Sequence, residues 1–257
     1  MESIIRSNML YKTGVEYGDY AMNHVLGCSH GCKYPCVAFM QKKRFRNSKS
    51  NFSYNQWCKP QLVANTLELL EDEIPKFKKK IQSVMLCPCT DPFMYGNKKV
   101  AAMSLSAMRR LNLSGIKCIV LTKGILPELL TSLPPINDYG ITLVSLNEDY
   151  RQLMEPGAAP ISDRLQALKN LHDKNLNTWV SIEPYPTPNL IEQDLDELLE
   201  AVSFVDKIVF GRTNYSKDVT SFKQHKKFYN DCTKQVIKFC MNHGIDCHIK
   251  KGTFTNF

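Results

Sequence analysis

Short apolar runs alternate with helical patterns along most of this chain of 257 residues. The runs are rich in Val, Ile and Leu, and several are continuously apolar, which is typical of strands buried on both faces of a parallel sheet. We expect strands at Ala21–Leu26, Ser83–Leu86, Lys117–Leu121, Ile141–Leu146, Thr178–Ile182 and Lys207–Phe210, with a short final strand at Cys247–Lys250.

Helical patterns fill the intervals between these strands. We expect helices at Gln61–Asp72, Ala101–Leu111, Ser162–Leu171, Leu190–Val202 and Phe222–Asn242. Alternating strands and helices imply right-handed crossovers and a parallel sheet. The α/β pattern predicts a partial (β/α)6 TIM-like barrel with parallel strands, since a full barrel takes about 250 residues. We expect one domain over 1–257, with a core at about 20–212 and a C-terminal helix and strand within 222–257 packing on it.

The composition is that of an ordinary globular protein, with 43% hydrophobic and 23% charged residues. Apolar stretches such as Cys118–Leu121 are far shorter than the roughly 20 residues that a membrane span needs. The N-terminus lacks a basic region followed by an apolar one, so we expect no signal peptide, no membrane partner and a cytoplasmic location. The net charge of +8 is concentrated partly in Lys42–Arg46 and Lys76–Lys80. It permits a nucleic-acid or nucleotide partner, and a solvated lysine face is the alternative.

Three of the ten cysteines, Cys28, Cys32 and Cys36, fall within nine residues directly after the first expected strand. Disulfides are not expected in the cytosol. Three thiolates on a short loop select a soft metal or an iron–sulfur cluster. Three protein ligands on a four-iron cluster would leave one iron open to a substrate or cofactor. Zinc with His30 as fourth ligand is the rival, although His30 lies between the cysteines and the spacing differs from paired C-x-x-C knuckles; three unrelated thiols are the second alternative.

At this loop the sequence resembles the radical S-adenosylmethionine (SAM) superfamily, whose usual motif is C-x-x-x-C-x-x-C, and within it the branch of spore photoproduct lyase. The resemblance spans roughly Tyr11–Phe210 and rests on short motifs in order: Gly27-Cys28 through Cys36, Thr90-Asp91-Pro92-Phe93, Thr122-Lys123, Glu155-Pro156 with Arg164, and Glu183-Pro184 with Pro186. Two features depart from the pattern. Three residues, not two, separate Cys32 from Cys36, and Val37 stands where the family has an aromatic, with Phe39 as a candidate substitute.

The resemblance implies a [4Fe–4S] cluster held by the three cysteines, with SAM bound at the open iron through its amino and carboxylate groups. An external electron donor of the flavodoxin or ferredoxin type would supply the electron that splits SAM into methionine and a 5′-deoxyadenosyl radical, and the radical would take a hydrogen atom from the substrate. Family likeness and basic charge together favour a nucleic-acid base or nucleotide as the substrate. A small molecule and a substrate delivered by a partner are alternatives.

Chemistry in such a fold gathers at the carboxyl ends of the strands. The resemblance places SAM-binding residues there: Thr90, Asp91, Lys123, Ser145, Asn147, Arg164 and Glu183. Thr90 and Asp91 would receive the amino group, and Lys123 would reach the carboxylate. Ser145 and Asn147 would bind the ribose, Arg164 would pair with Glu155 and the methionyl carboxylate, and Glu183 would line the adenine or substrate side. An Asp-Pro turn, a surface lysine, a turn around Ser145 and a structural Arg–Glu pair are the simpler interpretations.

Cys89 matches by position the cysteine that returns a hydrogen atom to the product radical in spore photoproduct lyases. A pair of small apolar residues, Cys87 and Cys89, ending a buried strand is the simpler account. Two functions from other classes stay open: a non-catalytic module that binds metal or nucleic acid through the cysteine loop, and a cluster enzyme that transfers methyl groups. A second group, formed by Cys240, His243, Cys247 and His248, is accounted for by the last helix and strand, with zinc as the alternative. Lys250 and Lys251 either reach the mouth of the barrel or form a solvated tail.

Overall fold

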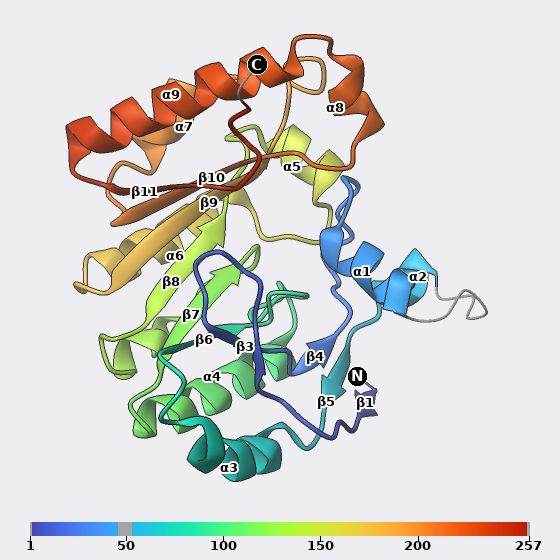
Figure 1. Cartoon of the computed structure of the whole chain (residues 1–257), viewed down its shortest axis with the longest axis vertical. Coiled ribbons are helices and arrows are strands. Elements are labelled where there is room, and N and C mark those ends of the chain that lie inside the picture. Colours follow the sequence, from blue (N-terminus) through green and yellow to red (C-terminus); the bar gives the residue numbers. More distant parts are fainter. Residues whose placement is uncertain (1, 46–52, 256–257) are drawn as a thin grey trace.

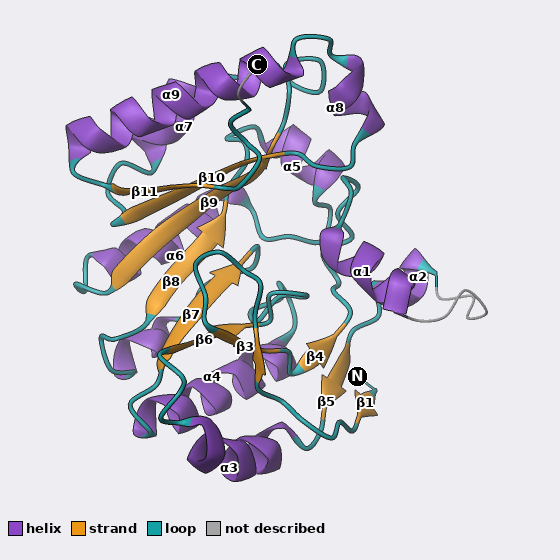
Figure 2. Ribbon diagram, in the orientation of Figure 1, coloured by secondary structure: helices purple, strands orange, loops and turns teal. Residues whose placement is uncertain are grey.

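The computed structural model describes residues 2–45 and 53–255. Arg46, the last residue of the basic run, lies outside this range, and the side chains of Lys42 and Arg44 are not described. Figure 1 shows a large twisted sheet with helices on one side, and a smaller sheet near the N-terminus. Figure 2 shows the same layers by secondary structure.

The large sheet has eight strands in the order β11-β10-β9-β8-β7-β6-β3-β2. All neighbouring pairs are parallel apart from β2 with β3, which is antiparallel. The strands are β2 (Tyr11–Lys12), β3 (Tyr20–Met22), β6 (Ser83–Leu86), β7 (Lys117–Thr122), β8 (Asp138–Thr142), β9 (Asn177–Tyr185), β10 (Lys207–Arg212) and β11 (Asp246–Ile249). Among the described residues, the edge strands β2 and β11 do not pair with each other, so the sheet is open. The expected α/β fold with a large parallel sheet is confirmed, and its description as a six-unit barrel stays a prediction.

Helices cover one face of this sheet (Figure 2). They are α3 (Thr66–Phe77), α4 (Lys98–Leu113), α6 (Ile161–His172), α7 (Leu195–Ala201) and α9 (His225–His243), with shorter α1 (Val37–Phe45), α2 (Tyr54–Trp57), α5 (Glu148–Met154), α8 (Lys217–Ser221) and the 3-10 helix η1 (Glu128–Ser132) elsewhere. The outer side chains of the strands, such as Val120, Val180 and Phe210, join the main apolar core beneath the helices. This burial on both faces is why the strands appear as continuous apolar runs in the sequence.

The inner face has its own apolar cluster, formed by Ala21, Met85, Ile119, Trp179 and Val209. The loop that joins β2 to β3 packs on this cluster through Val15 and Tyr17, and it lies in front of the sheet in Figure 1. On the neighbouring strand β8, Gly140 leaves space for the indole of Trp179, because an added Cβ there would lie 2.3 Å from the ring. The inner face is therefore filled at its centre and open at its two ends.

The first expected strand, Ala21–Leu26, is two strands in different sheets. β3 belongs to the large sheet, whereas β4 (Val25–Leu26) pairs with β5 (Gln61–Val63) in a three-stranded sheet completed by β1 (Ser3–Ile4). Asn23 and His24 lie buried at the break. The chain thus leaves the large sheet before the cysteine loop begins, which the apolar pattern did not reveal.

Other expected elements have different bounds. Residues 61–63, expected as a helix start, form β5, and α3 ends at Phe77, beyond the expected Asp72. β8 begins at Asp138 and ends at Thr142, earlier than the expected 141–146. Helix α7 covers Leu195–Ala201 only, within the expected 190–202. No described helix is long and apolar enough to cross a membrane.

Candidate functional site

A cavity of about 350 Å³ opens at the carboxyl ends of the parallel strands. We call it the carboxyl-end cavity. It brings together seven of the predicted site residues: Cys28, Cys32, Cys36, Cys89, Thr90, Asp91 and Lys123, with Glu183 as an eighth at its far side. Side chains from β6, β7, β9 and β10 therefore meet the cysteine loop at one place, as expected for parallel strands.

Local backbone contacts fix the start of the cysteine loop. Gly27 has a left-handed φ of +90°, and an added Cβ would lie 2.5 Å from the carbonyl oxygen of Trp57, so only glycine fits. The next residue, Cys28, donates its N–H to that same oxygen at 2.9 Å. The Tyr54 hydroxyl donates to the carbonyl of Cys32. Helix α2 thus holds the loop against the small sheet.

Two thiols of the loop, those of Cys28 and Cys32, are held in their protonated form by burial. Burial raises the pKa of Cys28 well above its usual value, and it raises that of Cys32 to about 11. Thiolate ligands bind metals only after losing their protons, so loading of this site releases protons.

His30 is engaged away from the thiols. Its Nδ1 lies 3.5 Å from Asp91 Oδ2, and its Nε2 accepts the N–H of Tyr95 at 3.3 Å. Burial lowers the pKa of His30, which keeps it neutral. Within the described part of the chain, no three His, Cys, Asp or Glu side chains are placed to hold a single metal ion. A cluster differs, because its cysteines bind separate irons and stand farther apart. The donor set fits the cluster better than zinc.

Asp91 is a buried carboxylate whose oxygens are satisfied within the protein. Oδ1 accepts the N–H of Phe93 and the hydroxyl of Thr122, and Oδ2 accepts the N–H of Lys123 at 2.8 Å. With His30 also in contact, this side chain ties the cysteine loop to the ends of β6 and β7. The geometry gives Asp91 a positioning role, and direct contact with SAM stays a prediction.

Thr90 and Cys89 face the same cavity with fewer protein partners. The hydroxyl of Thr90 is buried and makes no hydrogen bond to nitrogen or oxygen of the described residues, a cost that a polar ligand would remove. The Cys89 thiol donates a weak hydrogen bond to Gln41 Oε1 at 4.0 Å and also contacts the side chains of Asn23 and Tyr11, while its N–H donates to Asn23 Oδ1. Burial raises the pKa of the Cys89 thiol, so it carries a hydrogen atom at neutral pH.

Cys87 also lines the cavity, and it belongs to a buried polar cluster. Its Sγ lies 3.3 Å from His24 Nδ1, and His24 Nε2 lies 2.8 Å from the hydroxyl of Ser104. Burial raises the pKa of Cys87 to about 12 and lowers that of His24 to about 4. These groups satisfy one another and hold the Cys87 thiol in place.

Lys123 is part of a buried charge network. Its Nζ lies 3.8 Å from Glu155 Oε1 and 5.4 Å from the centre of the Tyr34 ring. The Tyr34 hydroxyl donates to Glu155 Oε1 at 2.6 Å, and Arg164 donates to Glu155 Oε2 at 2.9 Å. Burial alone would lower the pKa of Lys123, but the negative charge of Glu155 acts in the opposite direction and the pKa is raised. The ammonium is charged, loosely paired and open to the cavity.

Three other predicted residues lie outside this cavity. Arg164 is buried, and besides Glu155 it donates to the carbonyls of Ala159 and Thr142. Ser145 accepts the N–H of Asn147, whose own side chain caps α5 by accepting from Tyr150. The structure therefore does not bring them together with the cysteines, and contacts with SAM at these positions stay predictions.

Glu183 lies inside β9, with its side chain against the backbone of Gly211. Burial raises its pKa, while Lys250 acts in the opposite direction. Sequence reasoning missed several neighbours on this wall: Tyr17, Trp57, Arg212 and Asn214 also line the cavity. For Arg212 and Asn214, the available signal in the sequence was their position shortly after the expected strand Lys207–Phe210. Phe39 packs on Tyr54 and Trp57 with ring centres 5.0 and 6.0 Å apart, and Trp57 reaches the cavity.

The second group of cysteines and histidines does not converge. His243 contacts the carbonyl of Phe239 through Nδ1, at 2.9 Å, whereas His248 contacts Glu16 through Nε2, at 3.0 Å. Cys240 and Cys247 lie against each other between α9 and β11. The helix and strand account for all four.

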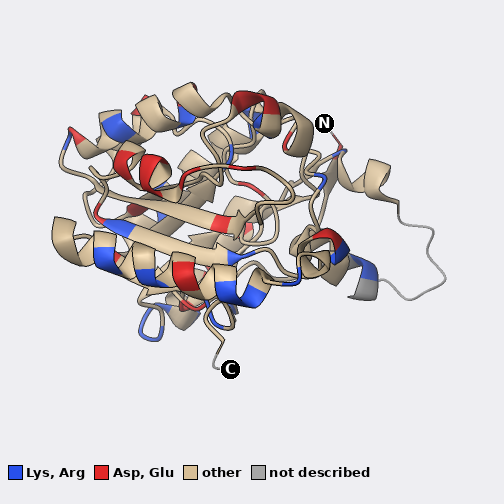
Figure 3. Cartoon of the chain, turned by 90° about the horizontal axis from the view of Figure 1, so that it is seen from above, with Lys and Arg blue, Asp and Glu red and all other residues tan. Residues whose placement is uncertain are grey.

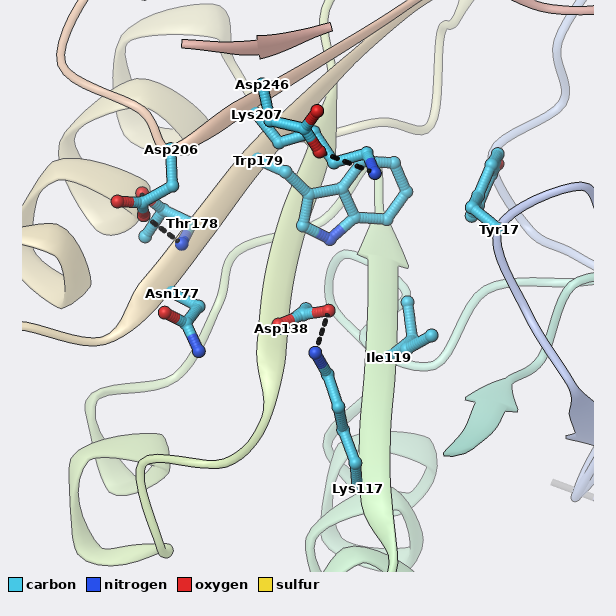
Figure 4. A pocket seen from close by; sticks show the side chains of 10 residues that line it. All are labelled: Tyr17, Lys117, Ile119, Asp138, Asn177, Thr178, Trp179, Asp206, Lys207 and Asp246. Atoms are coloured by element: carbon cyan, nitrogen blue, oxygen red, sulfur yellow. Dashed lines mark hydrogen bonds and ion pairs between the residues drawn. The ribbon is translucent and has the colours of Figure 1, made fainter. Parts of the chain in front are cut away.

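A second cavity, of about 360 Å³, lies at the amino ends of β7 to β11. Figure 4 shows this amino-end cavity with Lys117 paired to Asp138 and Lys207 paired to Asp246, at 2.6 and 2.9 Å. Tyr17 lines both cavities and meets Trp179 edge-on, with ring centres 5.2 Å apart. The charges at this end are satisfied by one another.

The basic excess is not gathered on one visible face. In Figure 3, Lys and Arg are interspersed with Asp and Glu along the helices. Exposed pairs such as Lys227 with Asp231 and Lys169 with Asp173 follow this pattern. Charge alone therefore favours no particular surface for a nucleic acid.

Comparisons with known proteins agree with this geometry. The family model described as the radical SAM superfamily matches residues 22–202, more than half of the chain. This chain belongs to the radical SAM superfamily. The family uses a [4Fe–4S] cluster and SAM, and the three thiols, the unsatisfied hydroxyl of Thr90 and the ammonium of Lys123 fit these two cofactors.

Solved structures show the same fold. A mutant of spore photoproduct lyase with bound AdoMet and dinucleoside spore photoproduct aligns over 98% of this chain and 81% of its own, with 12% identity and a TM-score of 0.68. SuiB of Streptococcus suis, bound to S-adenosylmethionine, aligns over 89% of this chain and 46% of its own, with 12% identity and a TM-score of 0.52. At these identities the likeness concerns the fold.

A curated relative is an uncharacterized protein, ORF301, of Acidianus two-tailed virus. It is 24% identical over 195 residues, which are 74% of this chain and 64% of that protein. The match therefore spans somewhat less than two thirds of the relative's length.

Proposed function

We propose that this protein cleaves SAM reductively at a [4Fe–4S] cluster held by Cys28, Cys32 and Cys36, and abstracts hydrogen from a nucleic-acid base or nucleotide. The observation that carries the proposal is the meeting of three thiols, an unsatisfied hydroxyl and a loosely paired ammonium in one cavity. When bound, the two cofactors supply a 5′-deoxyadenosyl radical that takes a hydrogen atom from the substrate.

The chain's own residues divide the work of binding. The ammonium of Lys123 neutralises the methionyl carboxylate, because its contact with Glu155 is long at 3.8 Å and leaves N–H donors free to turn towards the cavity. The hydroxyl of Thr90 gains the partner that it lacks within the protein. Asp91 and Arg164 act indirectly, by positioning other residues. Asp91 holds the cysteine loop through His30, and Arg164 holds Glu155 in place behind Lys123.

Cys89 returns a hydrogen atom to the product radical: its S–H bond breaks, a C–H bond forms, and the thiyl radical left on Cys89 takes up one proton and one electron from the external donor to restore the thiol. Two features support this role. Its thiol lines the cavity, where its contact with Gln41 is long at 4.0 Å, and burial raises its pKa, which keeps it protonated. Cys87 is a poorer donor in this respect, since His24 holds its thiol. An external electron donor of the flavodoxin or ferredoxin type completes the proposal.

The likeness to spore photoproduct lyase, whose structure holds a dinucleoside spore photoproduct, supports a nucleotide substrate, and so does the net charge of +8. Anaerobic reconstitution with iron and sulfide tests the reaction. We expect a brown protein that binds four irons and releases 5′-deoxyadenosine from SAM when a reductant is added. A colourless zinc protein that releases none would overturn the proposal. Loss of the SAM methyl group to a substrate would indicate a methyltransferase.

A further inference from the structure

The two edges of the open sheet are joined by one carboxylate. Glu16 lies at the tip of the loop between β2 and β3, at one edge, and it contacts residues of β11 and beyond, at the other. His248 Nε2 lies 3.0 Å from Oε2, Lys250 Nζ lies 3.2 Å from Oε1, and the N–H of Lys251 donates to Oε2 at 3.1 Å. Three donors thus surround one carboxylate.

Such a set of donors is a site for an oxyanion. An ammonium, a backbone N–H and an imidazole arranged around two oxygens is how proteins hold carboxylates and phosphates. The Glu16 side chain is 30% exposed and that of His248 is 27% exposed, so solvent and solutes reach the contact. Ion pairs with this exposure are weak. Another anion of higher charge can therefore replace Glu16.

The site adjoins the cavity where the proposed chemistry takes place. Lys250 lines that cavity, as do Val15 and Tyr17, the neighbours of Glu16. Lys250 Nζ also lies 5.2 Å above the ring of Tyr17. An anion held by Lys250 would thus stand at the cavity's edge, with the rest of its molecule inside.

The wall beside Lys250 carries a second cation, Arg212. Its Nε donates to the neutral side chain of Asn214 at 2.8 Å. Glu183 is the carboxylate that faces them. With Glu16 displaced, Arg212 and Lys250 would face this one carboxylate, which favours a ligand with negative charge on this side.

We propose that Lys250 Nζ, the Lys251 N–H and His248 form a binding site for a phosphate group of the substrate, which the carboxylate of Glu16 fills in this structure. The inference rests on the proposed function for the identity of the substrate as a nucleotide. A phosphate carries more charge than a carboxylate and has more acceptor oxygens, so it exchanges with Glu16 and releases the loop that covers the cavity.

Equilibrium binding to the reconstituted full-length protein tests the site. The probes are thymidine 5′-monophosphate, neutral thymidine, and N-acetylaspartate as a carboxylate of similar charge. We expect the monophosphate to bind at least about fivefold more tightly than thymidine, the effect of one favourable ion pair. Equal affinities for the monophosphate and thymidine, or tighter binding of N-acetylaspartate than of the monophosphate, would overturn the assignment.

Variants distinguish an anion site that Glu16 occupies from a purely structural contact, because the two predict opposite changes in affinity for the monophosphate. Glu16→Gln removes the competing charge, so we expect about fivefold tighter binding of the monophosphate, whereas a purely structural role predicts weaker or unchanged binding. Lys250→Gln should weaken binding about fivefold. Lys251→Gln is the matched control, because it removes the same charge but keeps the N–H, and its affinity should stay within twofold of wild type.

Two controls keep the outcomes distinct. Urea unfolding checks that each variant is folded, and Glu16→Ala serves as a second variant if Glu16→Gln is unstable. Release of 5′-deoxyadenosine from SAM without nucleotide reports on the proposed function alone. Unchanged monophosphate affinity in Glu16→Gln, with normal release of 5′-deoxyadenosine, would refute the phosphate site and leave the proposed function standing. Tighter monophosphate affinity without release of 5′-deoxyadenosine would refute the proposed function and leave the phosphate site standing.

Discussion

The two ends of the same parallel strands hold cavities of nearly equal volume, about 350 Å³ at the carboxyl ends and about 360 Å³ at the amino ends. At the amino ends, lysines and aspartates form direct pairs and satisfy one another (Figure 4). At the carboxyl ends, three cysteine thiols of one loop face the cavity together with a hydroxyl that has no hydrogen-bond partner among the described residues and an ammonium whose ion pair is long at 3.8 Å. The difference shows that volume does not identify a site, whereas polar groups that lack partners do.

The largest expected effect concerns the cysteine loop. We expect Cys32→Ala to lose the cluster, because two thiolates cannot replace three on separate irons. Iron and sulfide analysis after anaerobic reconstitution measures the loss, and circular dichroism checks the fold. Cys247→Ala, far from this loop, is the control and should keep the full iron content. Full iron in Cys32→Ala would remove it from the ligand set.

Cys89→Ala tests the substrate side of the carboxyl-end cavity. The variant keeps all proposed SAM ligands, so we expect 5′-deoxyadenosine release to continue while the product of the substrate radical changes. Mass spectrometry of the products measures this. Cys87→Ala is the neighbouring control, since His24 holds that thiol. An unchanged product from Cys89→Ala would reduce Cys89 to a packing residue.

Arg164→Met compares a buried pair with an exposed one. Loss of Arg164 leaves Glu155 buried with Lys123 and Tyr34 only, so we expect about 3 kcal/mol of lost stability, the low end for a broken buried pair. Lys207→Met breaks the half-exposed pair with Asp246 at the amino ends and should cost less than about 1 kcal/mol. Urea unfolding measures both, and equal losses would contradict the contrast between the two ends.

Lys123 and Lys117 offer the closest comparison, because they lie at the two ends of β7. Lys123→Met should weaken SAM binding about tenfold by removing the partner of the methionyl carboxylate, about 1.4 kcal/mol. Lys117→Met loses its pair with Asp138 and should bind SAM as wild type does. Isothermal titration of the reconstituted proteins measures the affinity for SAM. An equal loss of SAM affinity in both variants would mean that Lys123 acts only through the net charge of the protein.

Much of the scaffold was predictable because burial on both faces gives continuous apolar runs, as at Val84–Leu86 and Ile208–Phe210. The departure of the chain at His24 was not, since a buried histidine held by Cys87 and Ser104 depends on residues 63 and 80 positions away. The signal for the candidate site was a position at or near the end of a strand: Lys123 directly follows β7, and Thr90 lies four residues beyond the end of β6.

Partners across the fold explain the remaining differences. Asp91 appears as a ligand in the sequence, but its oxygens are taken by backbone N–H groups of Phe93 and Lys123. Ser145 was placed at a strand end, yet β8 stops at Thr142. Glu16 carries no motif, and its contact with Lys251 spans 235 positions. No local pattern encodes such contacts.

The central claim is that SAM binds at the cysteine loop in the carboxyl-end cavity. The most direct measurement is the electron paramagnetic resonance spectrum of the reduced, reconstituted protein as SAM is added. The account predicts a shifted spectrum that saturates with SAM, with Lys123→Met needing about tenfold more SAM than wild type or Lys117→Met. A spectrum that stays unchanged at saturating SAM would contradict the account.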